Sequence, residues 1–298
     1  PHYGKSLNPL LEGHTPGGSS GGSGAVVSGY LCPAALGTDT MGSVRVPAAY
    51  CGIVGFKPTK NFWSTAGVTP LSVTLDTIGP LARSVSDIAL LSGLTLKNID
   101  VKSCNVASLE NFDYADMEDE IKSGYEETKK LLLNSGVSIG QARLSDYDPS
   151  SARRAGLLVS EVEACVLLED FRLKSQEAFS PELQTMLDFG RRAPASRYFN
   201  AIQKIQTLKR ELCSIFQKQK FVITPTTPQT PFPFLKDTPT NQADFTALAN
   251  FCGCPAISLP LKRSGEEKPV GLQIMAGPGS DIDLLSLALG IEKLISNN

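Results

Sequence analysis

Two serines in glycine-rich surroundings are the residues of this chain whose type and spacing best suit covalent chemistry. Ser19 lies in TPGGSSGGSGAVV (15–27), and Ser43 lies 24 residues later in GTDTMGSVRVPAAYCG (37–52). Glycine permits close backbone approach, so several N–H groups can point at one atom, which is how an oxyanion hole is built. The pattern therefore predicts serine-based nucleophilic catalysis.

Other interpretations of the first serine segment fit its residues less well. A flexible linker separates folded units, whereas this run leads directly into the apolar stretch AVVSGYLCPAALG. A Walker loop needs a lysine where Ser23 follows Gly22, and a dinucleotide fingerprint needs a third glycine where Val27 stands. A tight, glycine-rich structural turn remains an alternative.

A serine hydroxyl needs a base before it can act as a nucleophile. The chain has only two histidines, His2 and His14, and both precede the serine motif in a stretch that we expect to be exposed. A Ser-His-Asp triad is therefore disfavoured. Lysine is the remaining candidate for the base.

The two serine segments resemble those of the amidase signature family. The likeness continues in TLDTIGPLARSVSDIALL (74–91), VITPTTP (222–228), ANFCGCPAISLPL (249–261) and PVGLQIMAGPGSDIDLL (269–285). The resemblance implies an α/β fold in which helices cover both faces of a mixed central β-sheet. It implies a single domain over residues 1–298, with variable substrate-pocket regions at about 110–200 and 229–245. The implied reaction is hydrolysis of a carboxamide C–N bond through a serine acyl-enzyme, without a cofactor or a metal ion.

The resemblance also implies roles for individual residues. Ser43 matches the nucleophile, and Ser19 matches a serine that follows a cis peptide bond with Gly18 and relays the proton between the nucleophile and a lysine. The implied oxyanion hole consists of the backbone N–H groups of Thr40, Met41, Gly42 and Ser43. Asp39 and Arg45 match positions that support the nucleophile loop. At Met41 the chain departs from the family pattern, which has glycine there.

The lysine of the family triad has no counterpart in this chain. In the family it lies many tens of residues before the bridging serine, and here only 18 residues precede Ser19. Lys5 and Lys57 match other family positions. We therefore expect that the printed chain lacks an N-terminal segment that carries the base, and that it is inactive by itself. A catalytically silent homologue is an alternative.

The amino-acid composition of the chain argues against several classes of binding partner. The formal net charge is -2 and no long basic cluster occurs, which argues against direct binding of nucleic acid. No apolar run approaches the roughly 20 residues that a membrane span needs. Seven cysteines without a CxxC pair suit reduced thiols in the cytoplasm. We expect a small-molecule carboxamide as substrate, and a homodimer is compatible with these features.

A second function within the amidase signature family is also compatible with the sequence. The chain could be the A subunit of a glutamyl-tRNA(Gln) amidotransferase, which hydrolyses glutamine and passes ammonia to a partner protein. Residues 180–199 (SPELQTMLDFGRRAPASRYF) are more similar to free-standing amidases, and this favours the hydrolase.

Sequence periodicity predicts the elements that hold these residues in place. Strands are predicted over 52–58, 221–228, 256–260 and 270–277, and helices over 84–96, 116–136, 153–178, 181–220 and 281–295, with a break at Pro194. Residues 97–113 and 229–244 are the least regular, and we expect the second of these to be a mobile loop.

Overall fold

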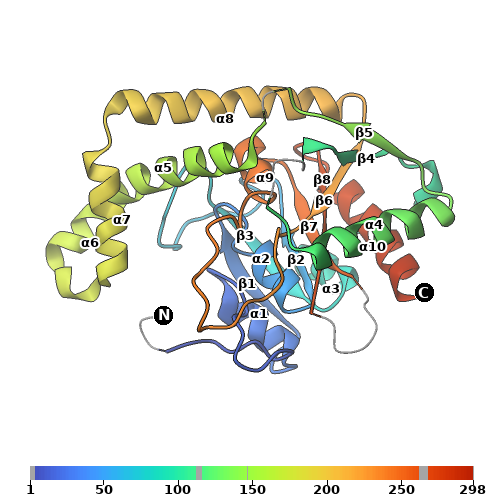
Figure 1. The fold of residues 1–298 in the computed structure, drawn as a ribbon, viewed down its shortest axis with the longest axis horizontal. Coiled ribbons are helices and arrows are strands. Elements are labelled where there is room, and N and C mark those ends of the chain that lie inside the picture. The colour runs from blue at the N-terminus through green and yellow to red at the C-terminus, as the bar shows by residue number, and fades with distance from the viewer. Residues whose placement is uncertain (1–3, 112–115, 146, 262–267, 298) are drawn as a thin grey trace.

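The computed structural model describes residues 4–111, 116–145, 147–261 and 268–297. Its strands are β1 (Ala34–Asp39), β2 (Val54–Lys57), β3 (Thr77–Ala82), β4 (Val106–Leu109), β5 (Ile139–Ala142), β6 (Phe221–Pro225), β7 (Ala256–Pro260) and β8 (Gly271–Ala276). They form one sheet of eight strands in the order β1-β3-β2-β7-β8-β6-β4-β5 (Figure 1). Strand β4 pairs in parallel with β5 and β6, and the other neighbouring strands are antiparallel.

Helices cover both faces of this sheet. They are α1 (Gly21–Ser28), α2 (Arg45–Tyr50), α3 (Val85–Leu91), α4 (Asp119–Asn134), α5 (Pro149–Leu167), α6 (Glu169–Lys174), α7 (Pro181–Arg192), α8 (Ala195–Phe216), α9 (Ala247–Cys252) and α10 (Asp281–Ser296). Because neighbouring residues of a strand point to opposite faces, Ile223 packs with α3, α4 and α10 while Val222 packs with α5, α8 and α9 (Figure 1). The predicted α/β fold with a mixed, doubly covered sheet is confirmed.

The predicted helices are present, but several have different ends. The range 153–178 contains two helices, α5 and α6, rather than one. The helix predicted over 84–96 is α3, which ends at Leu91 because Gly93 adopts a left-handed conformation with a φ of 65°. The predicted break at Pro194 is confirmed, since this residue separates α7 from α8. None of the described helices is both long enough and apolar enough to span a membrane.

The segment 97–113, expected to be among the least regular, contains the short strand β4 within its described residues. This strand lies between β6 and β5, and its four residues are buried. Its sequence, VASL, is too short to show a period by which a strand can be recognised. For the same reason our sequence analysis assigned no element to the short strand β5 or to the short helices α2 and α9.

Candidate active site

Ser43 lies in the loop that joins β1 to α2, and it lines a cavity of about 450 Å³. The lining comes from three parts of the chain, within 5–18, 41–46 and 232–243. The last part belongs to one of the two pocket segments expected from the sequence. No described residue of 110–200 lines this cavity, so a substrate-binding role for that region stays a prediction.

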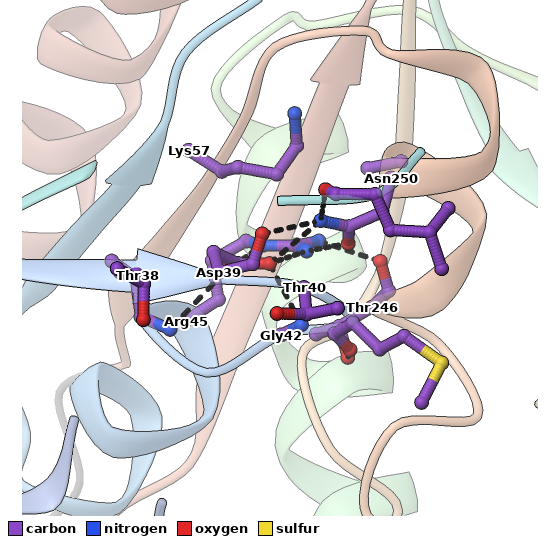
Figure 2. Close-up of polar contacts among 12 residues, drawn as sticks. Thr38, Asp39, Thr40, Gly42, Arg45, Lys57, Thr246 and Asn250 are labelled. Atoms are coloured by element: carbon purple, nitrogen blue, oxygen red, sulfur yellow. Dashed lines mark hydrogen bonds and ion pairs between the residues drawn. The ribbon is translucent and has the colours of Figure 1, made fainter. Parts of the chain in front are cut away.

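A buried ion pair holds the β1–α2 loop in shape (Figure 2). The carboxylate of Asp39 accepts hydrogen bonds from the backbone N–H groups of Gly42 (2.7 Å) and Val44 (3.2 Å). It also pairs with Arg45 through Nε (3.0 Å) and Nη2 (2.8 Å), and neither side chain is exposed. Burial by itself would raise the pKa of Asp39, but the charge and hydrogen bonds of Arg45 lower it below the usual value. Asp39 and Arg45 therefore contact this loop directly, and their supporting role in catalysis stays a prediction.

The remaining donors of Arg45 reach segments more than 200 residues away. Its Nη1 donates to the carbonyl of Thr246 (2.8 Å) and to Oε1 of Gln273 (2.5 Å), and Nη2 donates to Oδ1 of Asn250 (2.7 Å). The amide of Asn250 in turn donates to the Asp39 carbonyl at 2.8 Å (Figure 2). The sequence patterns predict no role for these three partners. Asn250 and Gln273 are each a single polar residue inside an otherwise apolar segment, and this is the signal that could have marked them.

Gly42 is required by the packing of the loop. Its φ of 130° is rare for residues with a side chain, and an added Cβ would lie 2.2 Å from Oγ1 of Thr246. That hydroxyl donates to the carbonyl of Met41 at 2.6 Å, so it cannot move away freely. The loop and the segment that precedes α9 thus fit together only when position 42 is glycine.

The four N–H groups expected to form an oxyanion hole are not equivalent. The N–H of Gly42 is already used by Asp39, so it is not available to a substrate oxygen. Within the described residues, the N–H groups of Thr40, Met41 and Ser43 have no acceptor. Met41 and Ser43 also line the cavity and are candidates for binding an oxyanion there, whereas Thr40 does not line it and its role stays a prediction.

Met41, the departure from the family pattern, is accommodated by the neighbouring helix α5. Its thioether packs against Gly156, where an added Cβ would lie 2.5 Å from the sulfur and 2.7 Å from the ring of Phe251. The side chain is half-buried and also lines the cavity. A glycine on α5 therefore provides the space that the larger side chain needs.

The first serine segment, which contains Ser19, lies beside the β1–α2 loop. The Gly18–Ser19 peptide bond is cis, as predicted, and the N–H of Ser20 donates to the Ser43 carbonyl at 3.1 Å. Ser19 is exposed, and Gly18 rather than Ser19 lines the cavity. Between these two described serines, Ser19 and Ser43, no hydrogen bond joins the hydroxyl groups. The proton relay through Ser19 therefore stays a prediction.

The glycine-serine run continues into helix α1, which packs closely on α2. An added Cβ on Gly24 would lie 3.1 Å from Cβ of Pro47 and 3.3 Å from Sγ of Cys51. A helix in direct contact with its neighbour is neither a flexible linker nor an open phosphate-binding loop. Gly24 therefore serves close helix packing, and this packing places α1 beside α2.

The basic side chains of the chain were also candidates for the catalytic base. Lys57 is fully buried, and burial lowers its pKa to about 8. Its ammonium donates to the carbonyl of Pro58 at 2.9 Å and points away from the Asp39 carboxylate (Figure 2), and the residue does not line the cavity. His14 is half-buried rather than exposed, and its Nδ1 lies 2.8 Å from a backbone carbonyl. His2 lies outside the described residues.

Comparisons by sequence and by structure both match this chain to amidases and to amidotransferase A subunits. A family model described as Amidase matches residues 1–285. The A subunit of glutamyl-tRNA(Gln) amidotransferase from Staphylococcus saprophyticus is 32% identical over 340 residues, covering 98% of this chain and 70% of the relative. A crystal structure of an amidase matches with a TM-score of 0.88 and 25% identity, covering 97% of this chain and 69% of that one. The crystal structure of the same amidotransferase component from Thermotoga maritima matches with a TM-score of 0.81 and 28% identity, covering 97% of this chain and 68% of that one.

Proposed function

The chain belongs to the amidase signature family and is an amide-hydrolysing enzyme, and from this premise we propose that it cleaves a small carboxamide through an acyl-enzyme on Ser43. The observation that carries the proposal is the position of this serine. It lines a cavity of about 450 Å³, a size suited to a small molecule, on a loop held by a buried ion pair.

The proposed reaction begins when the Ser43 hydroxyl attacks the amide carbonyl. Negative charge then develops on the carbonyl oxygen, and the N–H groups of Thr40, Met41 and Ser43 are the proposed donors that stabilise it. Because the Asp39–Arg45 pair fixes the loop beforehand, these donors need little rearrangement during the reaction. The amine leaves with a proton, and water then hydrolyses the acyl-enzyme.

We propose that Ser19 relays the proton between Ser43 and a basic group, as the family resemblance implies. The described lysines and His14 form no hydrogen bond with either serine. An assay of amide hydrolysis by chain 1–298 tests where the base lies. Turnover by this chain would assign the base to one of its own residues, and His14 and Lys5 would then be the first residues to substitute.

The proposed nucleophile is tested by Ser43→Ala. The variant is expected to lose amide hydrolysis by several orders of magnitude, because no acyl-enzyme can form. A fluorophosphonate probe should label Ser43 in the wild type, as peptide mass mapping can show. Ser23→Ala is the matched control, since this serine lies in the glycine-rich run of Ser19, does not line the cavity and donates to the Leu36 carbonyl. Near-native turnover by Ser43→Ala would refute the assignment.

A glutamine-dependent function is the second candidate, and the names of the curated relatives favour it. The two functions differ in substrate range and in the need for a partner. A free-standing amidase should release ammonia from simple carboxamides by itself. Hydrolysis of glutamine alone, and only beside added amidotransferase subunits, would favour the second candidate. Failure of Ser43 to react with the probe under every condition would leave a catalytically silent homologue.

A further inference from the structure

The lining of the cavity at Ser43 carries an excess of positive charge. Lys5 and Lys236 both line it, whereas no described aspartate or glutamate does. Neither lysine forms an ion pair with any described carboxylate. Cationic groups without a counter-ion in a concave site attract anions, because the low-dielectric walls concentrate their field.

Backbone hydrogen bonds place Lys236 at the cavity. Its own N–H donates to the Pro233 carbonyl at 3.0 Å, which closes a turn. This turn is joined to the segment ahead of the serine motif, since Phe234 N–H donates to the Gly13 carbonyl (3.1 Å) and Thr15 N–H to the Phe232 carbonyl (3.0 Å). The start of 229–244, a segment that we expected to be mobile, is therefore hydrogen-bonded to residues 13–15 and buried along 229–232.

Lys5 is brought to the same turn from the beginning of the chain. Its ammonium lies 4.8 Å from the centroid of the Phe234 ring, in a cation–π contact. Phe234 also lines the cavity and lies two residues before Lys236. Two segments more than 200 residues apart thus each contribute one ammonium group to a single cavity.

The other side chains at the cavity restrict what can accompany an anion. Val46 and Phe232 add apolar surface, so the lining combines the proposed nucleophile Ser43, an apolar wall and two exposed cations. A ligand that matches all three has an amide, a hydrocarbon spacer and an anionic end. A carboxylate fits best, because it accepts charge-assisted hydrogen bonds from ammonium groups.

We propose that this cavity selects carboxamides whose acyl part carries a carboxylate, and that Lys236 and Lys5 determine this specificity. The inference rests on the proposed function, since the amide must reach Ser43. The carboxylate takes no part in bond making or breaking. It orients the amide, and the two lysines are binding residues rather than catalytic ones.

Binding without turnover tests this specificity separately from the reaction. Calorimetric titration of the Ser43→Ala variant would compare succinamate with succinamide, which has the same shape but no charge. Succinamate is expected to bind about tenfold more tightly, and Lys236→Gln in this background should remove the preference. Lys218→Gln is the matched control, because this exposed lysine lies outside the cavity. Equal binding of the two compounds, or no binding of either, would overturn the proposal.

Hydrolysis by the wild-type protein gives a second, independent measurement. The ratio of kcat/KM for succinamate to that for succinamide should fall about tenfold in Lys236→Gln, and added salt should lower the same ratio. In Lys236→Glu the preference should shift toward the cationic 3-aminopropanamide. An unchanged ratio in both variants overturns the specificity while hydrolysis stands. Preferred binding of succinamate without hydrolysis of any amide supports the specificity and refutes the proposed reaction.

Discussion

At the scale of single residues, Lys57 shows how burial changes the chemistry of a side chain. It is fully enclosed beside the Asp39–Arg45 pair, and burial lowers its pKa from 10.5 to about 8. Burial disfavours the charged form, and one hydrogen bond to the Pro58 carbonyl offsets this only in part. A lowered pKa is therefore no evidence that this lysine is the catalytic base, because its environment explains it.

The lowered pKa of Lys57 predicts a pH dependence of stability. Between about pH 8 and 10.5 the unfolded chain holds the proton and the folded chain does not, so this group adds stability as the pH rises. The free energy of unfolding of the wild type, minus that of Lys57→Met, should increase over this window by about 1.4 kcal/mol per unit of pKa difference. Urea denaturation across the window measures it, with the exposed Lys218→Met as control. A difference that stays constant with pH would contradict the assignment.

At the scale of elements, short helices and loops position the serines through close contact. Helix α1 approaches α2 at Gly24, and the β1–α2 loop meets the segment before α9 at Gly42. Both contacts depend on the absence of a side chain. Glycine at such a place lowers the stability of its helix or loop. The close packing that glycine permits compensates for this loss.

Two alanine substitutions in α1 should have opposite effects. Gly24→Ala is expected to destabilise the fold by about 1–3 kcal/mol, because the new methyl group meets the ring and the carbonyl of Pro47. Gly22→Ala is the matched control, since its Cβ would lie 3.6 Å from Oγ of Ser6, an ordinary contact. It should be neutral or stabilising by up to about 1 kcal/mol, the helix preference of alanine. Thermal unfolding distinguishes the two, and equal losses would disprove close packing at position 24.

At the scale of the whole molecule, one buried polar network joins distant parts of the chain. Arg45 binds Asp39 locally, but it also reaches Gln273 on β8 and Asn250 on α9. The side chain of Gln273 continues the network to Thr224 on β6 at 2.9 Å. The residues of this network are hydrogen-bond partners of one another. The loss of one side chain therefore leaves a buried charge or hydrogen-bond donor without a partner.

Asp39→Asn tests the importance of this network for the whole fold. The variant keeps the shape of the side chain but leaves the Arg45 charge buried and unpaired, so a loss of about 3–5 kcal/mol of unfolding free energy is expected. Asp283→Asn is the matched control, because this carboxylate pairs at the surface with Lys97 and Lys220. Asp283→Asn should lower the free energy of unfolding by less than about 1 kcal/mol for each exposed ion pair that it removes. Similar values for the two variants, measured in urea, would contradict a structural role of the buried pair.

The sequence by itself determined the reaction class and the larger elements. The motifs around Ser19 and Ser43 carried the family resemblance, and the long periodic segments predicted α4 and α10 within a few residues. The cis bond before Ser19 also followed from the motif. These features are local, because a motif or a helical period is complete within one stretch of chain.

Only the tertiary structure decided which groups meet around the serines. The contacts of Arg45 with Thr246 and Gln273 span 201 and 228 residues, and no local pattern predicts such pairs. The same holds for the engagement of the Gly42 N–H by Asp39 and for the arrival of Lys5 and Lys236 at one cavity. The physical reason is that hydrogen bonds and cavity walls form between segments brought together by burial of the core, and that encounter is a property of the whole fold.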